Sequence, residues 1–378
     1  LGPVTLRPTP AEPPGFTPGR RVIEVNAREA AGECYNFWSI QNFTSQHMFA
    51  DPAGRAVTIQ RHPFMKQVNC VRLIGGREDG RNEWFQGVDA QGQPRCDFTG
   101  LIKYVRGMLD WGYTPRLVLD NVPTAMSQPP QMNTYGNTYP PKDYNLYHAY
   151  IQALTRALVN EFGAAVAGQW RYRVMTEPDL FPGHWAGTRE EWLKLYDYAV
   201  DAVTQVIPDA DIGPGNILDP SGGERAGREK WGLEIVDHCA QGRNDRTGAT
   251  GTRMRFFSCS WYGRVGRSND DFDLAIRAMR ERLGRYPRFR DLPVEVAEFS
   301  VLTDEGGRRL ESGEATEWSG SFLASIAARV YRLNVAQVHL WGTTAGLRPI
   351  PYAHVLTLLE RMAPGRSVVK LSLPSATF

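Results

Sequence analysis

Short apolar runs alternate with longer helical patterns through most of this sequence, and this rhythm limits the possible fold more than any other feature. Such alternation is typical of parallel strands joined by crossover helices. Eight runs are candidate strands: residues 36–40, 68–74, 116–121, 170–176, 211–216, 255–262, 294–298 and 336–341. Helical patterns follow at residues 99–111, 146–162, 189–206, 227–240, 271–283, 319–331 and 352–362. The clearest helix begins with a capping box, because Glu191 follows Thr188 by three residues.

Eight strands with helices between them predict an α/β fold, the (β/α)8 TIM barrel. An open doubly wound sheet would need an early Gly-x-Gly-x-x-Gly turn, and the chain has none. We expect residues 21–365 to form the barrel and residues 1–20 an extended segment. Residues 366–378 are expected to form a strand that packs with this segment, so that the two termini make a small appended β element. Long loops at 75–97 and 122–143 are expected to build a substrate cleft.

Composition argues against several classes of protein. The net charge is +2, with 43 basic and 41 acidic residues and no basic stripe, which disfavours a nucleic-acid partner. No apolar run approaches the ~18–20 residues of a membrane span. The 7 histidines and 5 cysteines show no metal-ligand spacing, so we expect no metal and no cofactor. The proline-rich opening resembles the lead of an exported protein and predicts a secreted or periplasmic location.

Two of the candidate strands end on a glutamate. Glu177 ends the fourth and Glu298 ends the seventh. Catalytic groups of a barrel lie where its strands end and its loops begin. Either glutamate alone is equally explained by an ion pair with a loop arginine, but two at corresponding strand ends favour chemistry. A pair of carboxyl groups is the equipment for cleaving a glycosidic bond. The 10 tryptophans agree with a sugar substrate, since the C–H faces of sugars stack on aromatic rings.

The blocks around these glutamates resemble a known family. The fourth strand and its helix, "RVMTEPDLFPGHWAGTREEWLKLYDYAVDAVTQVIPDADIGPGN", resemble the Asn-Glu-Pro block of glycoside hydrolase family 39, the β-xylosidase and α-iduronidase family of clan A. "LPVEVAEFS" resembles its nucleophile strand, "FFSCSWYG" its sixth strand and "VRLIGG" its second strand, which bears an arginine. The resemblance covers roughly residues 65 to 345.

The resemblance implies a retaining double displacement, with Glu177 as general acid/base and Glu298 as nucleophile. Their carboxyl groups would then lie about 5 to 5.5 Å apart. Tyr262 would hydrogen-bond Glu298, and Arg72 would lie beneath it as a permanent cation. Trp341, at the end of the eighth strand, would stack on the bound sugar.

The other candidates for substrate contact are Asn121, Thr176, His184, Trp185 and Ser260. The family usually has Asn where this chain has Thr176, and His where it has Ser260. Both changes affect groups that read the sugar ring, so the resemblance supports the chemistry better than it supports any one sugar.

These patterns together predict a secreted or periplasmic retaining glycosidase. We expect it to be exo-acting on an oligosaccharide or a side chain of a plant or bacterial polysaccharide, with no nucleic-acid or membrane partner. One alternative is an endo-acting hydrolase of an exopolysaccharide. Another is a non-catalytic carbohydrate-binding barrel that kept the cleft and lost turnover.

Overall fold

The computed structural model describes residues 24–44, 46–51, 53, 64–127, 132–221, 231–265, 268–305, 308–310, 318–341, 351–362 and 367–372. The chain forms two compact units. Tyr35–Pro364 is one unit, and Leu1–Cys34 with Gly365–Phe378 is the other.

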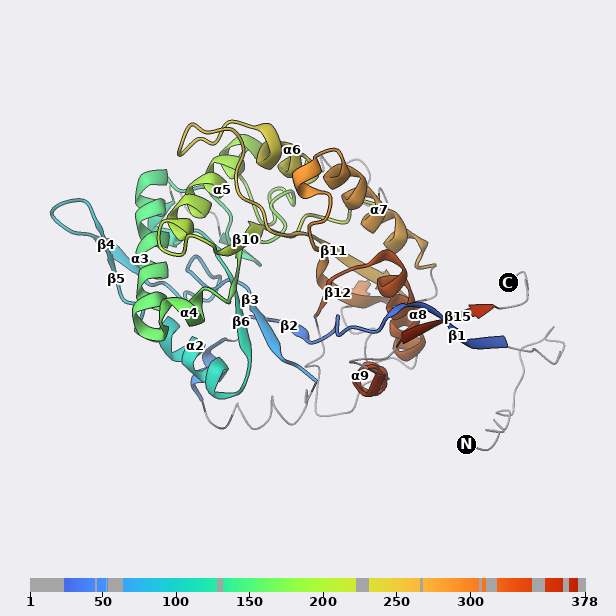
Figure 1. Cartoon of the computed structure of the whole chain (residues 1–378). Helices are drawn as coiled ribbons and strands as arrows, with labels where there is room; N and C mark the ends of the chain where they lie inside the picture. Colours follow the sequence, from blue (N-terminus) through green and yellow to red (C-terminus); the bar gives the residue numbers. More distant parts are fainter. Residues whose placement is uncertain are drawn as a thin grey trace. The chain divides into compact units, whose positions relative to one another are not determined.

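The larger unit is a barrel of eight parallel strands (Figure 1). In chain order the strands are β2 (Ile40–Phe43), β3 (Gln67–Cys70), β6 (Thr114–Val118), β9 (Arg171–Val174), β10 (Asp211–Pro214), β11 (Phe257–Arg264), β12 (Val294–Glu305) and β14 (Gln337–Leu340). Neighbours pair in the order β10-β9-β6-β3-β2-β14-β12-β11. The ring closes beyond β10, where the N–H of Ile217 donates to the carbonyl of Ser258 at 3.0 Å. The N–H of Ser260 donates back to Ile217 at 2.8 Å, which confirms the predicted (β/α)8 architecture.

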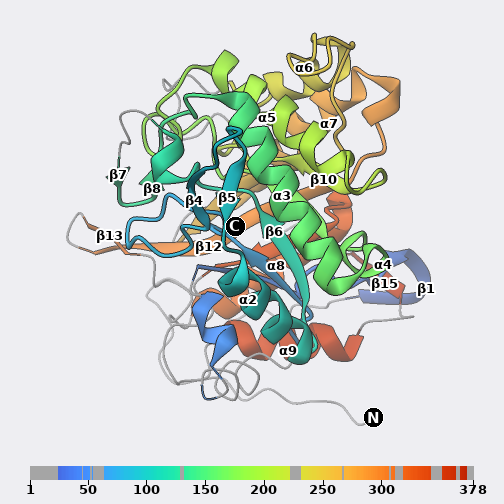
Figure 2. The same ribbon diagram turned by 90° about the vertical axis from the view of Figure 1, so that its left-hand side faces the viewer.

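Helices α3 and α5 lie side by side on the outside of the barrel (Figure 2). The helices are α2 (Thr99–Asp110), α3 (Tyr144–Phe162), α4 (Ala164–Ala167), α5 (Arg189–Thr204), α6 (Glu234–Gln241), α7 (Asp270–Gly284), α8 (Trp318–Leu333) and α9 (Pro351–Met362). Short 3-10 turns lie at η1 (Gln46–Ala50), η2 (Thr124–Met126) and η3 (Pro287–Phe289). The predicted capping box of α5 is present, since Thr188 and Glu191 exchange side chain to backbone hydrogen bonds. Part of the predicted helix 227–240 lies outside the described residues, and α6 begins at Glu234.

The first predicted strand was placed too early. Residues 36–40 were expected to be extended, but the strand is Ile40–Phe43. The side chain of Asn36 accepts hydrogen bonds from the backbone N–H groups of Trp38 and Ser39, at 3.2 and 3.1 Å. This local turn takes the backbone out of the extended conformation. The aromatic rings at 37 and 38 are therefore buried in a turn, although their apolar character suggested a strand.

Both long loops carry short hairpins. The loop after β3 contains β4 (Phe85–Val88) and β5 (Pro94–Cys96), and the loop after β6 contains β7 (Met132–Asn133) and β8 (Gly136–Asn137). At the far end of β12, β13 (Arg308–Leu310) pairs with it antiparallel.

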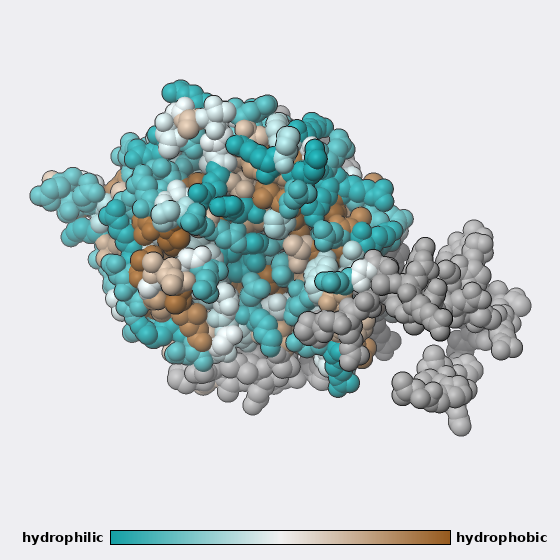
Figure 3. All heavy atoms as spheres, in the orientation of Figure 1, coloured by the Kyte–Doolittle hydropathy of each residue, from teal (hydrophilic) through white to brown (hydrophobic). Residues whose placement is uncertain are grey.

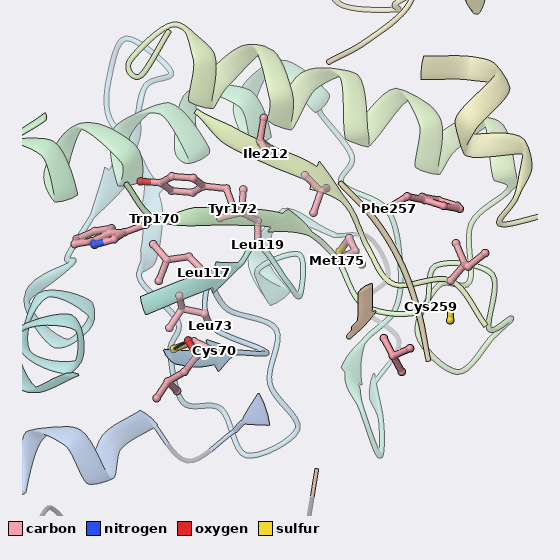
Figure 4. Packing of buried hydrophobic residues seen from close by; sticks show 14 of the residues in the cluster. Cys70, Leu73, Leu117, Leu119, Trp170, Tyr172, Met175, Ile212, Phe257 and Cys259 are labelled. Carbon is pink, nitrogen blue, oxygen red and sulfur yellow. Dashed lines mark hydrogen bonds between the residues drawn. The ribbon is translucent and has the colours of Figure 1, made fainter. Parts of the chain in front are cut away.

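Outward-facing strand residues form the core against the helices (Figure 4). On β11 the residues Phe257, Cys259 and Trp261 belong to this core, with the period of two that strands impose. The rings of Trp261, Phe299 of β12 and Phe322 of α8 stack against one another in one cluster. The intervening residues of β11 therefore face the barrel interior. Hydrophilic residues cover most of the face drawn in Figure 3, with hydrophobic patches between them.

The terminal unit is a two-stranded antiparallel sheet of β1 (Glu24–Glu33) and β15 (Ser367–Ser372). The sequence predicted a β element from the two termini, but with residues 1–20 as the partner of the C-terminal strand. Those residues lie outside the described part of the chain, β15 pairs with β1, and the domain limits at residues 20 and 365 stay a prediction. Within the described residues, no helix has the length and apolarity needed to cross a membrane.

Candidate active site

One of the two predicted catalytic glutamates follows a strand of the barrel, and the other lies within a strand of the same barrel. Glu177 comes three residues after β9 and is buried, at 4% exposure. The backbone at Met175 and Glu177 takes positive φ, 68° and 38°, a conformation that side-chain-bearing residues adopt rarely and mostly at functional sites. The chain turns sharply here, away from the line of the strand.

Glu298 reaches the barrel interior because of a β-bulge. Period-two alternation would put Glu295 and Glu298 on opposite faces of β12. The pairing with β11 skips a residue between Val296 and Glu298, and the pairing with β14 skips between Val296 and Phe299. Phe299 consequently packs outward on Phe322. A bulge of this kind re-aims a side chain at a barrel rim, and here it turns the glutamate inward.

Tyr262 donates its hydroxyl to Oε1 of Glu298, as the family resemblance implied. A hydrogen bond to a carboxylate stabilises the ionised form, which a nucleophile requires. The neighbouring inward residue of β11, Ser260, lies opposite Glu298 in the strand pairing. Its oxygen accepts a hydrogen bond of 2.6 Å from the amide of Asn216.

A stack of rings lies beside Glu177. Nε2 of His184 is 3.7 Å from Oε2 of Glu177, and the imidazole stacks on Tyr135 with ring centres 4.3 Å apart. The guanidinium of Arg72 lies 5.2 Å from the centre of the Tyr135 ring. His184 therefore lies beside a predicted catalytic residue, and its predicted contact with substrate stays a prediction. Tyr135 was missed, because a single aromatic in a long loop has no periodicity to identify it.

Arg72 has other partners than the one expected. Its guanidinium lies 3.3 Å from Glu78, and its backbone N–H donates to Asp120 at 2.5 Å. Its φ of 56° turns the chain at the end of β3, which directs the side chain toward the loop. The expected contact with Glu298 is not among the interactions of Arg72 in the structure, and any contact with substrate stays a prediction.

Arg173 of β9 is the buried cation of the site. It is 3% exposed, and its Nη2 donates to the hydroxyl of Thr176 at 3.2 Å. Burial lowers the pKa of Arg173, while the charges of nearby carboxylates, Glu298 and Glu177 among them, oppose that shift. Its Nε and Nη1 have no hydrogen-bond partner among the described residues. A sequence pattern could have identified it, since Arg171 and Arg173 alternate in a strand that is otherwise buried and apolar.

Thr176 is engaged within the protein. Its hydroxyl donates to Oδ2 of Asp120 at 2.7 Å and accepts from Arg173. A hydroxyl has one proton to give, so Thr176 can offer a sugar only an acceptor in this arrangement. Burial raises the pKa of Asp120, and the hydrogen bond from Thr176 opposes that shift.

Three other residues predicted to contact the substrate have structural roles. The amide of Asn121 donates to the carbonyls of Tyr135 and Asn137, at 2.8 and 2.9 Å, and so orders the second long loop. Trp185 is buried, and its indole N–H donates to the carbonyl of Thr188 at 2.8 Å. Trp341 is partly buried just beyond β14, where its N–H donates to Phe299. Contact of these three residues with substrate stays a prediction.

The described residues contain no cluster of three or more His, Cys, Asp or Glu that could hold a metal ion. The site is thus built from carboxylates, a tyrosine, a histidine and a buried arginine.

A (β/α)8 barrel with glutamates at its fourth and seventh strands is the architecture of clan A glycoside hydrolases. The model of glycosyl hydrolases family 39 matches residues 22–306, and the chain belongs to this family. The predicted recognition is confirmed.

The chain is similar to curated relatives with different named activities. It is 23% identical to an α-1,4-L-rhamnosidase of Formosa agariphila over 265 residues, which cover 65% of this chain and 50% of the relative. It is 27% identical to a β-xylosidase of Caldicellulosiruptor saccharolyticus over 231 residues, or 58% of this chain and 43% of the relative. The chain thus spans about half the length of the curated relatives it matches.

The fold is similar to that of solved structures. A monomeric β-xylosidase from Caulobacter crescentus CB15 aligns with a TM-score of 0.72 at 18% identity, covering 94% of this chain and 73% of that one. This likeness supports the barrel and says nothing of the substrate.

Proposed function

We propose that this protein is a retaining glycoside hydrolase in which Glu298 is the nucleophile and Glu177 the general acid/base. The observation that carries the proposal is the bulge in β12, which turns Glu298 inward onto the hydroxyl of Tyr262. A purely structural glutamate would need no such departure from the strand. Membership of family 39 supports the same chemistry.

The proposed reaction has two steps. A carboxylate oxygen of Glu298 attacks the anomeric carbon while Glu177 gives its proton to the departing glycosidic oxygen, and a covalent glycosyl-enzyme forms. Glu177 then takes a proton from water, whose oxygen attacks the anomeric carbon and releases Glu298. Tyr262 keeps the nucleophile oriented, and Arg173 offers a positive charge near both carboxylates.

We propose an exo-acting enzyme that removes a sugar from an oligosaccharide or polysaccharide side chain. The named relatives cleave rhamnosides and xylosides, so the family alone does not select the sugar. Thr176 and Ser260 are both engaged by neighbouring side chains, which supports a sugar subsite different from that of the β-xylosidases. Secretion or periplasmic export stays a prediction from the sequence.

The test is a release assay over a panel of aryl glycosides with wild type and Glu298→Ala. We expect cleavage of one sugar by the wild type and loss of cleavage in the variant. Added azide should restore turnover in Glu298→Ala and yield the glycosyl azide of inverted configuration, because the small anion fills the space of the missing carboxylate. Equal activity of the two proteins would contradict the proposal.

If the folded wild type cleaves no glycoside of the panel but still binds glycans, the carbohydrate-binding barrel would be favoured instead. The engagement of Thr176 by Asp120 is the observation that keeps this alternative in view, because it withdraws a hydroxyl proton from the sugar.

A further inference from the structure

A cavity of about 1140 Å³ lies beside the proposed acid/base. Its walls are the loop after β9, the first turn of α5 and the start of α6. Pockets for drug-sized ligands typically measure about 300–1,000 Å³, so this cavity has room for a ligand larger than a single sugar. Neither Glu177 nor Glu298 lines it. The cavity is therefore distinct from the position of the two proposed catalytic carboxylates.

The position of the cavity relates it to the leaving group. Pro178 and Asp179, the two residues after Glu177 in the chain, form part of its wall. In the proposed reaction Glu177 protonates the departing oxygen, so the departing part of the substrate lies on its side of the bond. Glu298, which would hold the other part, belongs to β12, and β10 and β11 separate that strand from β9 in the ring.

Two aromatic rings in the wall are suited to sugar faces. Phe181 is 66% exposed and lines the cavity, so its ring is accessible to a ligand there. Trp231 is partly buried against Trp192, with ring centres 5.6 Å apart, so packing on Trp192 holds the Trp231 ring in position. Rigid aromatic surface at the rim of a cavity gives contact area at little cost in conformational entropy.

The charges of the wall exclude one class of ligand. Four carboxylates line the cavity: Asp179, Glu190, Glu191 and Glu234. Among the described residues of the lining, Arg189 is the single cation, and it is paired with Glu190 at 2.6 Å and with Glu234. The described part of the lining is therefore net negative. Like charges placed together disfavour a partner strongly, so a uronic acid or sulfated sugar would be repelled.

We propose that this cavity binds the leaving-group side of the substrate as two or more uncharged sugar units, stacked on Phe181 and Trp231. The inference rests on the proposed function, because it takes Glu177 as the group that protonates the leaving oxygen. It deepens that function by assigning a neutral oligosaccharide to the departing part.

Calorimetric titration tests the proposal without requiring turnover. The protein is Glu298→Gln, and the probes are the neutral tetrasaccharides of xylose, glucose and mannose, with tetragalacturonate as the anionic comparison. We expect a neutral tetrasaccharide to bind at least roughly tenfold more tightly than tetragalacturonate, from like-charge repulsion. Adding Phe181→Ala or Trp231→Ala should weaken neutral binding by roughly three- to tenfold, the range of one aromatic contact.

Leu274→Ala is the matched control, since Leu274 is a comparably exposed apolar residue of α7 that does not line the cavity. It should leave binding unchanged. Of the two aromatic variants, Phe181→Ala carries the lower risk of unfolding, because an exposed ring contributes little to the stability of the fold. Circular dichroism of the Trp231→Ala protein shows whether its core is intact.

The proposal is overturned if no neutral probe binds, if both aromatic variants bind as the parent does, or if tetragalacturonate binds equally well. Cleavage of aryl glycosides by wild type reports the proposed function separately. If wild type cleaves aryl glycosides but the aromatic variants bind the neutral probes as well as the parent does, the proposed hydrolase function stands and this subsite is rejected. Aromatic-dependent binding of neutral probes without any cleavage would retain the cavity as a saccharide site and reject the reaction.

Discussion

Glu295 and Glu298 lie three residues apart on β12, and the protein gives them opposite environments. Glu295 is 1% exposed and pairs with Arg116 at 2.6 Å, with Arg171 and with His339 at 3.2 Å. Burial alone would raise the pKa of Glu295, but the two arginines hold it well below its usual range. Glu298 is only partly buried, and a tyrosine hydroxyl donates to it.

The difference separates a structural carboxylate from one that can react. Glu295 is committed to its cations at the end of the barrel where the strands begin, and breaking those ion pairs would leave buried charges. Glu298 lies further along the strand, toward the end where barrel active sites form. The bulge between them allows one strand to serve both purposes with two inward-facing glutamates.

Glu298→Gln should give the largest effect on activity. Removing a nucleophile typically lowers kcat by about 10⁴ to 10⁶-fold. The melting temperature should change little, since a glutamine keeps the shape of the side chain and can still accept from Tyr262. Steady-state rates and calorimetry on the same preparation measure both. A large fall in melting temperature with rates preserved would reverse the assignment of the two glutamates.

Glu295→Gln should give the opposite pattern. Removing one partner of a buried ion pair typically destabilises by about 3–5 kcal/mol, and here Arg116 and Arg171 would both lose their carboxylate. Urea unfolding measures the change. At a temperature where the variant is folded, its turnover should stay close to that of wild type. A protein as stable as wild type would show that the network contributes no net stability.

Tyr262→Phe should give a smaller loss of activity. A hydrogen bond to a charged group is worth about 1.5–3 kcal/mol, so kcat should fall by roughly 10- to 100-fold. The ring still packs, so stability should change much less than in Glu295→Gln. Rates of the variant across pH show whether the nucleophile is harder to ionise, because loss of this donor should move the acid limb of the profile upward. An unchanged acid limb would contradict a role in stabilising the ionised form.

The smallest effect expected is on the pH dependence of stability. Burial, and next the charge of Arg116, lower the pKa of His339 to about 3, although Glu295 opposes this. An unfolded histidine titrates near pH ~6.5, so the unfolded chain binds more protons between these values. The contribution of His339 is therefore present above pH ~6.5 and is lost as pH falls toward 3. The lowered pKa of Glu295 acts in the same direction, and the raised pKa of Asp120 against it.

His339→Gln should flatten this dependence between pH 7 and pH 5. Melting temperatures of both proteins at the two values measure it, and Glu298→Gln serves as a reference with the histidine network intact. A variant that loses as much stability as wild type over this interval would show that His339 does not carry the effect.

The eight-strand order and the assignment of the two glutamates to the fourth and seventh strands were predictable because each depends on local patterns. Glu298 does not end its strand as predicted, since β12 continues to Glu305. A strand, its helix and its terminal residue are read within a few dozen residues. The network of Glu295 was not predictable, because its partners come from β6, β9 and β14 and meet only when the barrel closes. The bulge was equally hidden, since the alternation of 294–298 predicts that Glu295 and Glu298 face opposite ways.

Local polar chemistry caused the remaining differences. Asn36 stabilises a turn where the sequence pattern predicted a strand. The turn at Arg72 directs the Arg72 side chain to Glu78. Arg173 could have been identified from the sequence. An arginine at an inward position of a buried strand is uncommon, and it needs an ionic partner or a functional role.

The most direct test of the account is the identity of the carboxylate that becomes covalently attached to sugar. Wild type is treated with the 2-deoxy-2-fluoro glycoside of the sugar that the release assay identifies, since fluorine destabilises the oxocarbenium-like transition state and lets the intermediate accumulate. Fragment-ion mass spectrometry of the peptide that contains β12 distinguishes its two glutamates. We predict a glycosyl adduct on Glu298. An adduct on Glu295 or Glu177, or steady cleavage of the parent glycoside without any adduct, would contradict the account.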